Sequence, residues 1–65
     1  MKIAKIGDTI EWSFPKDHNT VFAGETHRAE VAMVDNDEKC YGVYASYGQD
    51  LIPFNEAKII KTNKQ

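Results

Sequence analysis

The stretch TIEWSF, residues 9–14, has the most regular pattern in this chain. Three large apolar residues, Ile10, Trp12 and Phe14, alternate with polar neighbours, which is the period of a strand with one buried face. Pro15, which follows, cannot donate a hydrogen bond to a sheet, so the strand is expected to stop there. We therefore predict a first strand over residues 9–14, with its three apolar side chains in the core.

The rest of the chain alternates between turn residues and short apolar runs. Residues 15–24 are polar and turn-rich and predict a long loop, in which the segment 21–23 around Phe22 folds back over one end of the core. Further strands are predicted over residues 29–34, 39–47, 49–54 and 58–61, with an acidic hairpin turn at residues 35–38, a bulge or bend at Gly42, and one 3₁₀ turn at residues 55–57. Because no long stretch has the helical apolar period, we expect a small, strongly bent all-β barrel of five strands.

The size of the chain limits its organisation. With 65 residues there is room for one domain, residues 1–65, whose ends at residues 1–5 and 62–65 are expected to be partly flexible. Neither a signal-peptide pattern nor an apolar run of membrane-spanning length occurs, so we expect a cytoplasmic protein that binds no membrane. We also expect it to be a monomer or weak homodimer. The single cysteine, Cys40, fits a reducing compartment.

The order of these features resembles that of a known fold. The chain has Gly7-Asp8 opening the first strand, a long loop, Val31-x-x-Val34, an acidic hairpin, QDLIPF at residues 49–54 and KIIK at residues 58–61. This order resembles the SH3-like barrels of the KOW and Tudor kind, and the resemblance implies a five-stranded SH3-like barrel. More narrowly, the opening KIAKIGDTIEW and the closing AKIIK are similar to a family of short uncharacterised proteins of Bacillus-type bacteria and their phages. That narrower resemblance implies no known activity.

No pattern in the chain indicates catalysis, a cofactor or a metal. His18, His27 and Cys40 are separated by intervals that match no zinc site, and the favoured interpretation is two loop histidines and a core cysteine. The acidic turn at residues 35–38 lacks the glycine and the distal glutamate of a calcium loop. The four glycines are scattered and form no phosphate-binding loop. We therefore expect a non-catalytic binding module without a cofactor.

Charge is distributed unevenly along the chain. The formal net charge is only −2, but residues 1–5 and 58–65 contain five lysines and no acid, whereas residues 6–57 contain three basic and ten acidic residues. In an SH3-like barrel the first and last strands are neighbours, so the terminal lysines should gather along one edge. Such an edge either contacts nucleic-acid phosphates or protects an exposed strand from aggregation. The candidate nucleic-acid residues are Lys2, Lys5, Lys58, Lys61 and Lys64.

Three tyrosines of the predicted third strand are the other candidate site. Tyr41 and Tyr47 share one face and Tyr44 lies on the other, so at least one ring should be exposed unless Gly42 bulges and resets the register. The other interpretation is that the rings simply cover a small core. We expect a protein-binding surface made of these tyrosines and an acidic rim of Asp35, Asp37, Glu38 and Asp50. The alternative is a KOW-like nucleic-acid-binding module in which the lysine edge contacts phosphates and a tyrosine stacks on a base.

Overall fold

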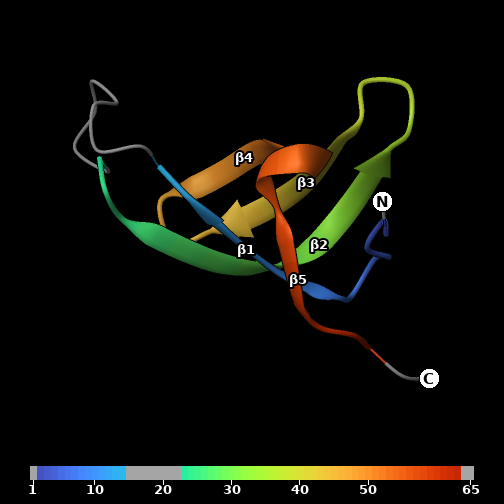
Figure 1. Ribbon diagram of the computed structural model, residues 1–65, viewed down its shortest axis with the longest axis horizontal. Helices are drawn as coiled ribbons and strands as arrows, with labels where there is room; N and C mark the ends of the chain where they lie inside the picture. Colours follow the sequence, from blue (N-terminus) through green and yellow to red (C-terminus); the bar gives the residue numbers. More distant parts are fainter. Residues whose placement is uncertain (1, 15–22, 64–65) are drawn as a thin grey trace.

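The computed structural model describes residues 2–14 and 23–63. Within this part of the chain, five antiparallel strands form one sheet in the order β4-β3-β2-β1-β5 (Figure 1). The strands are β1 (Thr9–Ser13), β2 (Thr26–Asp35), β3 (Cys40–Ala45), β4 (Gly48–Pro53) and β5 (Lys58–Lys61), and one 3₁₀ turn, η1 (Phe54–Glu56), precedes β5. The expected all-β fold, with a helical turn before the last strand, is confirmed.

The first strand has the predicted alternation. Ile10 is fully buried and Trp12 nearly so, whereas Phe14, just beyond the end of β1, packs against the core and is partly buried. β1 pairs with β2 on one side and with β5 on the other, so the first and last strands are neighbours as expected. Because β1 and β5 are antiparallel, the residues just before β1 and those just after β5 lie at the same end of the sheet.

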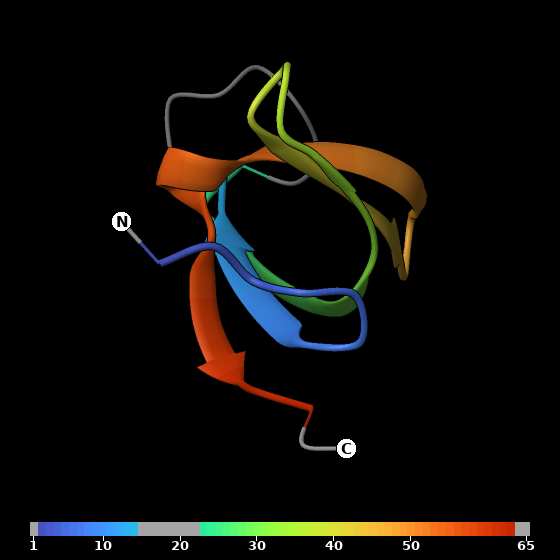
Figure 2. The same ribbon diagram turned by 90° about the vertical axis from the view of Figure 1, so that its right-hand side faces the viewer.

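The second strand is longer than predicted and joins both halves of the barrel. It begins at Thr26 and not at residue 29. Its first three residues are polar, but they pair with β1 through backbone hydrogen bonds, which need no apolar side chain. Two side-chain contacts support this pairing, Ser13 with Thr26 at 2.9 Å and Arg28 with Glu11 at 2.8 Å. The second half of β2 pairs with β3, and the strand curves between its two partners (Figure 2).

The core lies inside this curved sheet. The segment before β1, each of the strands β1 to β4, and η1 contribute buried residues to it. These residues are Ala4, Ile10, Trp12, Val31, Tyr41, Val43, Ile52 and Phe54. The predicted loop at residues 15–24, including the contact of Phe22 with the core, lies mostly outside the described residues. No helix within residues 2–14 and 23–63 is long and apolar enough to cross a membrane.

Candidate binding groove on the outer face of β2, β3 and β4

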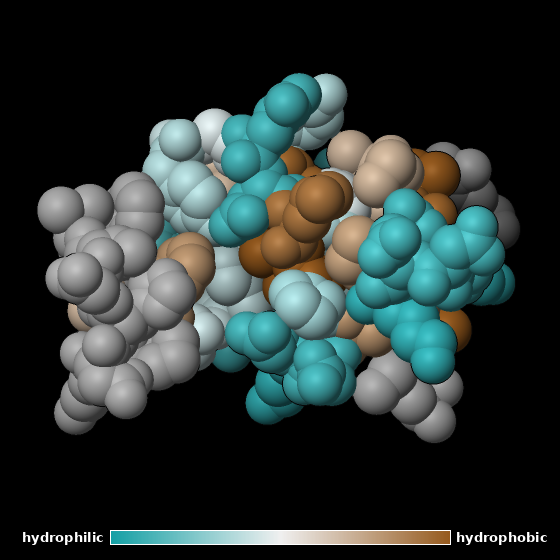
Figure 3. All heavy atoms as spheres, turned by 90° about the horizontal axis from the view of Figure 1, so that it is seen from above, coloured by the Kyte–Doolittle hydropathy of each residue, from teal (hydrophilic) through white to brown (hydrophobic). Residues whose placement is uncertain are grey.

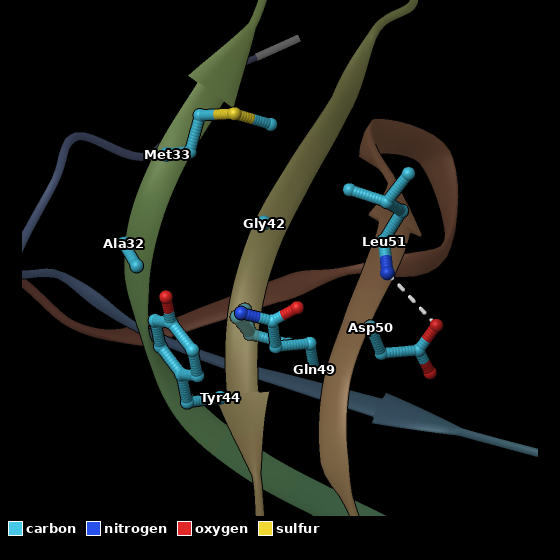
Figure 4. A pocket seen from close by; sticks show the side chains of 8 residues that line it. Ala32, Met33, Gly42, Tyr44, Gln49, Asp50 and Leu51 are labelled. Carbon is cyan, nitrogen blue, oxygen red and sulfur yellow. Dashed lines mark hydrogen bonds between the residues drawn. The ribbon is translucent and has the colours of Figure 1, made fainter.

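A groove of about 560 Å³ lies on the face of the sheet that points away from the core. Side chains alternate along strands, so Tyr41 and Val43 of β3 face inward whereas Gly42 and Tyr44 face outward. On β4, Gln49 and Leu51 pair with these outward residues. Figure 4 shows how β2, β3 and β4 supply the lining, which consists of Ala32, Met33, Gly42, Val43, Tyr44, Gln49, Asp50 and Leu51.

The rim of the groove is apolar and open to solvent. Tyr44 is 67% exposed, Leu51 60% and Met33 44%. Seen from the side on which β4 and the β2–β3 turn lie nearest, hydrophobic atoms are exposed in the middle of the surface between hydrophilic side chains (Figure 3). Large apolar side chains gathered around a hollow are typical of surfaces that bind other molecules.

Gly42 forms the floor of the groove. A Cβ at this position would lie 3.1 Å from Cβ and 3.3 Å from Cε of Met33, and 3.9 Å from a methyl group of Leu51. The glycines with positive φ are Gly7, Gly24 and Gly48, so the backbone at Gly42 does not require glycine. The absence of a side chain at residue 42 therefore keeps the groove open. The irregularity predicted at Gly42 lies on the facing strand, where the register shifts between Val31 and Met33.

The three candidate tyrosines do not form one surface. Tyr41 is 1% exposed and belongs to the core, where its ring packs against Phe54 with centroids 4.6 Å apart. The expectation that Tyr41 contributes to a binding surface is therefore wrong, because its inward parity on β3 places the ring inside the barrel. Tyr44 lines the groove, and Tyr47 is half-buried in the two-residue turn between β3 and β4.

Tyr47 instead supports the strand that carries one side of the groove. Its hydroxyl donates to Oδ2 of Asp50 at 2.5 Å, and Oδ1 of Asp50 accepts the backbone N–H of Leu51 at 2.8 Å. Burial, and then the hydrogen bond to Asp50, raises the pKa of Tyr47 to about 12. The Asp50 carboxylate is thus engaged on both oxygens and holds the β3–β4 hairpin beside Leu51.

An aromatic cluster at the C-terminal end of β1 was not foreseen from the sequence. His27 lies 5.1 Å from Tyr47, 5.6 Å from Phe14 and 6.2 Å from Trp12, measured between ring centroids. The register of β1 and β2 would have revealed it, because Trp12 pairs with His27 across the two strands. Nε1 of Trp12 is buried and makes no standard hydrogen bond with a described residue. Its proximity to Tyr47 lowers the pKa of the Tyr47 hydroxyl, against the larger effect of burial, which raises it.

The acidic rim is divided between two places. Asp35 closes the β2–β3 turn, where its Oδ1 accepts the N–H groups of Asp37 and Glu38, each at 3.0 Å. Asp37 and Glu38 are exposed in this turn. Asp50 pairs with Val43, three residues along β3 from the pair of Asp35 with Cys40, so it is not contiguous with the turn.

Of the terminal lysines, those on β5 lie at the other end of the sheet order from the groove. Lys58 and Lys61 are exposed on β5, and Lys2 and Lys5 are exposed in the segment before β1. None of these four forms an ion pair with another described residue. Tyr44 is on β3, three strands away from β5, so the exposed tyrosine and the lysines of β5 do not adjoin within the sheet. The segment that contains Lys2 and Lys5 instead meets the start of β3, where Ala4 contacts Tyr41. Lys64 lies outside the described residues.

The described residues bring together no group of three or more metal-ligating side chains. Cys40 is buried, and burial, followed by the charges of Asp35 and Glu38, raises the pKa of its thiol. A raised pKa makes the thiol a weak nucleophile and a weak metal ligand. His18, the third residue weighed as a metal ligand, lies outside the described residues.

Comparison with known proteins identifies the fold. No protein-family model matches the sequence, and neither does a curated protein. The structure is similar to a chain in the crystal structure of the MjSpt4:Spt5 complex, with a TM-score of 0.73 and 20% sequence identity. The similarity covers 100% of this chain and 42% of that chain, so this protein spans less than half the length of its structural relative. At this identity the likeness shows the fold, which is the small SH3-like barrel of the KOW kind.

Proposed function

We propose that this protein is a non-catalytic module that binds another protein, and that the groove on the outer face of β2, β3 and β4 receives an apolar side chain of the partner. The module acts in the cytoplasm as a monomer or weak homodimer. A binding role is compatible with the structural relative, which was crystallised in a complex.

The observation that carries the proposal is the open floor at Gly42. Glycine inside a strand is less stable than alanine by about 0.5–1 kcal/mol, and here no backbone requirement offsets that cost. Around this floor Met33, Tyr44 and Leu51 expose large apolar areas that would be more stable if covered. A site of this kind is suited to an apolar anchor, which is the usual centre of a protein interface.

A displayed library of random linear peptides tests the proposal. Peptides selected on the natural protein are titrated into the natural protein, Gly42→Ala and Leu51→Ser. We expect both variants to bind more weakly, the first because a methyl group fills the floor and the second because the rim loses apolar area. Ile6→Ser is the matched control, since Ile6 is 67% exposed and does not line the groove.

Two results would contradict the proposal. One is selected peptides that bind Gly42→Ala and Leu51→Ser as tightly as the natural protein. The other is a selection that yields no specific peptide although the protein is folded. The amide signals of Gly42, Tyr44 and Leu51 in an NMR titration locate the bound peptide independently of the variants.

Nucleic-acid binding is the second candidate function. The observation that favours it is the exposure of Lys2, Lys5, Lys58 and Lys61, none of which is paired with an acid among the described residues. Titration with short single- and double-stranded oligonucleotides at low salt tests it. Shifts of the lysine amides that disappear as salt is raised would support phosphate contacts. No shift at millimolar oligonucleotide would eliminate this candidate.

A further inference from the structure

We propose that the groove takes an extended peptide segment in which a bulky apolar residue lies within two to four positions of a lysine or arginine, and that this basic residue meets the acidic β2–β3 turn at Asp37 and Glu38. This inference rests on the proposed protein-binding function and specifies the partner. It follows from the charge around the groove, from the spacing along β3 and from the way the turn is held.

The charge around the groove is one-sided. Among the described residues that line it, Asp50 is the only charged one, and none is a lysine or an arginine. Both oxygens of the Asp50 carboxylate already accept hydrogen bonds, and in Figure 4 one of them is joined to the N–H of Leu51. Asp50 is therefore less suited to a new partner than an acid without such bonds. Of the other exposed acids near the groove, Asp37 and Glu38 of the nearby turn supply two charges, whereas Glu30, two residues from Ala32 on β2, supplies one.

The spacing connects the groove to that turn. Gly42 pairs with Met33. Two residues earlier, at the beginning of β3, Cys40 pairs with Asp35 at the start of the turn. At about 3.3 Å per residue, the floor of the groove lies roughly 7 Å from the end of the strand and about 13 Å from Glu38 along an extended path. An extended peptide covers the same distances in two to four residues. A long lysine or arginine side chain can then reach the turn while the apolar anchor occupies the floor.

The turn is held without the side chains that would bind. Asp35 accepts the backbone N–H groups of Asp37 and Glu38, so the turn depends on Asp35 and on the positive φ of 57° at Lys39. The carboxylates of Asp37 and Glu38 are exposed and form no ion pair with a described residue. Lys39 offsets one of the two charges, and the turn keeps a negative balance that complements a basic residue.

Four synthetic peptides of equal length test this inference by NMR titration of the labelled protein. The first three have a central tryptophan flanked, two residues away on each side, by lysine, by glutamine or by glutamate, and the fourth replaces the tryptophan of the lysine peptide by serine. We expect the lysine peptide to bind about fivefold or more tighter than the glutamate peptide. Its binding should shift the amides of Gly42, Leu51 and Glu38, and the preference should shrink as salt is raised.

The double variant Asp37→Lys/Glu38→Lys supplies the decisive comparison. It should reverse the preference in favour of the glutamate peptide, because only the sign of the charge at the turn changes. The control Glu25→Lys/Glu30→Lys alters the net charge equally at residues that do not belong to the turn, and should keep the original preference.

The outcomes separate the two proposals. If the lysine and glutamate peptides shift the groove amides with equal affinity, or if the charge-reversed turn keeps the preference for lysine, the inference about the basic residue is overturned and the groove remains a binding site. If none of the tryptophan peptides shifts the groove amides, or if the serine peptide binds as tightly as its parent, the apolar anchor is wrong and the inference falls with it.

Discussion

The phenolic oxygen of Tyr41 accepts a hydrogen bond from the backbone N–H of Ala4 at 2.8 Å, and both residues are buried. The contact joins the start of β3 to the segment before β1, across 37 residues of chain. It closes one side of the barrel and satisfies an N–H that would otherwise be buried without a partner. Tyr41 is therefore a structural residue, and its hydroxyl group supplies the acceptor for the buried N–H of Ala4.

The first prediction concerns this hydrogen bond. Tyr41→Phe keeps the ring packed against Phe54 but leaves the N–H of Ala4 buried without its acceptor, which costs about 1–3 kcal/mol. Urea denaturation measures the loss. Tyr44→Phe removes the same hydroxyl from an exposed ring and should change stability by less than about 0.5 kcal/mol. Equal effects of the two substitutions would contradict the assigned role of the Ala4 contact.

The second prediction concerns the pH dependence of stability through Asp8. Its buried carboxylate accepts the N–H of Lys5 and that of Asn63, each at 2.8 Å, and these two hydrogen bonds hold the pKa of Asp8 below its ordinary value of 3.8. Because the pKa is lower in the folded state, the stabilisation is present above the unfolded-state pKa and is lost as pH falls through the folded-state pKa.

Asp8→Asn should therefore be less stable than the natural protein near neutral pH, and the difference should shrink in acid. Thermal or urea unfolding as a function of pH measures it. Asp37→Asn, at an exposed acid whose side chain makes no hydrogen bond among the described residues, is the control. A difference between Asp8→Asn and the natural protein that is constant down to strongly acidic pH would show that the charge of Asp8 is irrelevant.

The third prediction concerns the titration of Tyr47. With a folded-state pKa of about 12 against an ordinary 10, the folded protein holds its phenolic proton more tightly than the unfolded chain. Stability due to this group is thus fully present below pH 10 and is lost as pH rises through 12. Asp50→Asn should lower the pKa of Tyr47, because burial then raises it without the help of Asp50 and against the lowering effect of Trp12. Ultraviolet absorbance of the phenolate measures both proteins, and an unchanged Tyr47 titration in Asp50→Asn would refute the assignment.

The fourth prediction contrasts two glycines of the same hairpin. Gly48 has a φ of +121°, which other residues rarely adopt, so Gly48→Ala should destabilise the protein by about 1–3 kcal/mol although no atom lies within 4 Å of the added methyl group. Gly42→Ala meets Met33 but has no such backbone strain, and Met33 is exposed enough to adjust. Its cost should be smaller. Urea denaturation of the two variants, under the same conditions, decides the order.

Much of the fold was predictable because it depends on local pattern. The alternation at Ile10 and Trp12 correctly indicated a half-buried strand, and the short apolar runs correctly indicated five strands and a 3₁₀ turn. The boundaries were less accurate where pairing does not depend on apolar side chains. β2 begins three residues earlier than predicted because Thr26 and Arg28 pair with β1 through the backbone and polar contacts.

The candidate site was only partly predictable. Parity along β3 correctly separated Tyr44 from Tyr41, but it could not say which of the two faces is buried. Sequence also could not show that Met33, Gly42 and Leu51, from three strands, surround one hollow, since that depends on the register of the strands. Gly42 was correctly seen as unusual within a strand, but its role in the groove was not.

The sequence by itself determined the fold class, the succession of five short strands along the chain and the separation of charge between the chain ends and the body, because these depend on the type and spacing of neighbouring residues. Only the tertiary structure decided which side chains lie together. It placed Tyr41 in the core and Tyr44 beside Leu51 on the outside, and it placed Lys61 on a strand remote from both. The physical reason is that a sheet has two faces and one register, and burial of the largest apolar set inside a curved barrel selects between them.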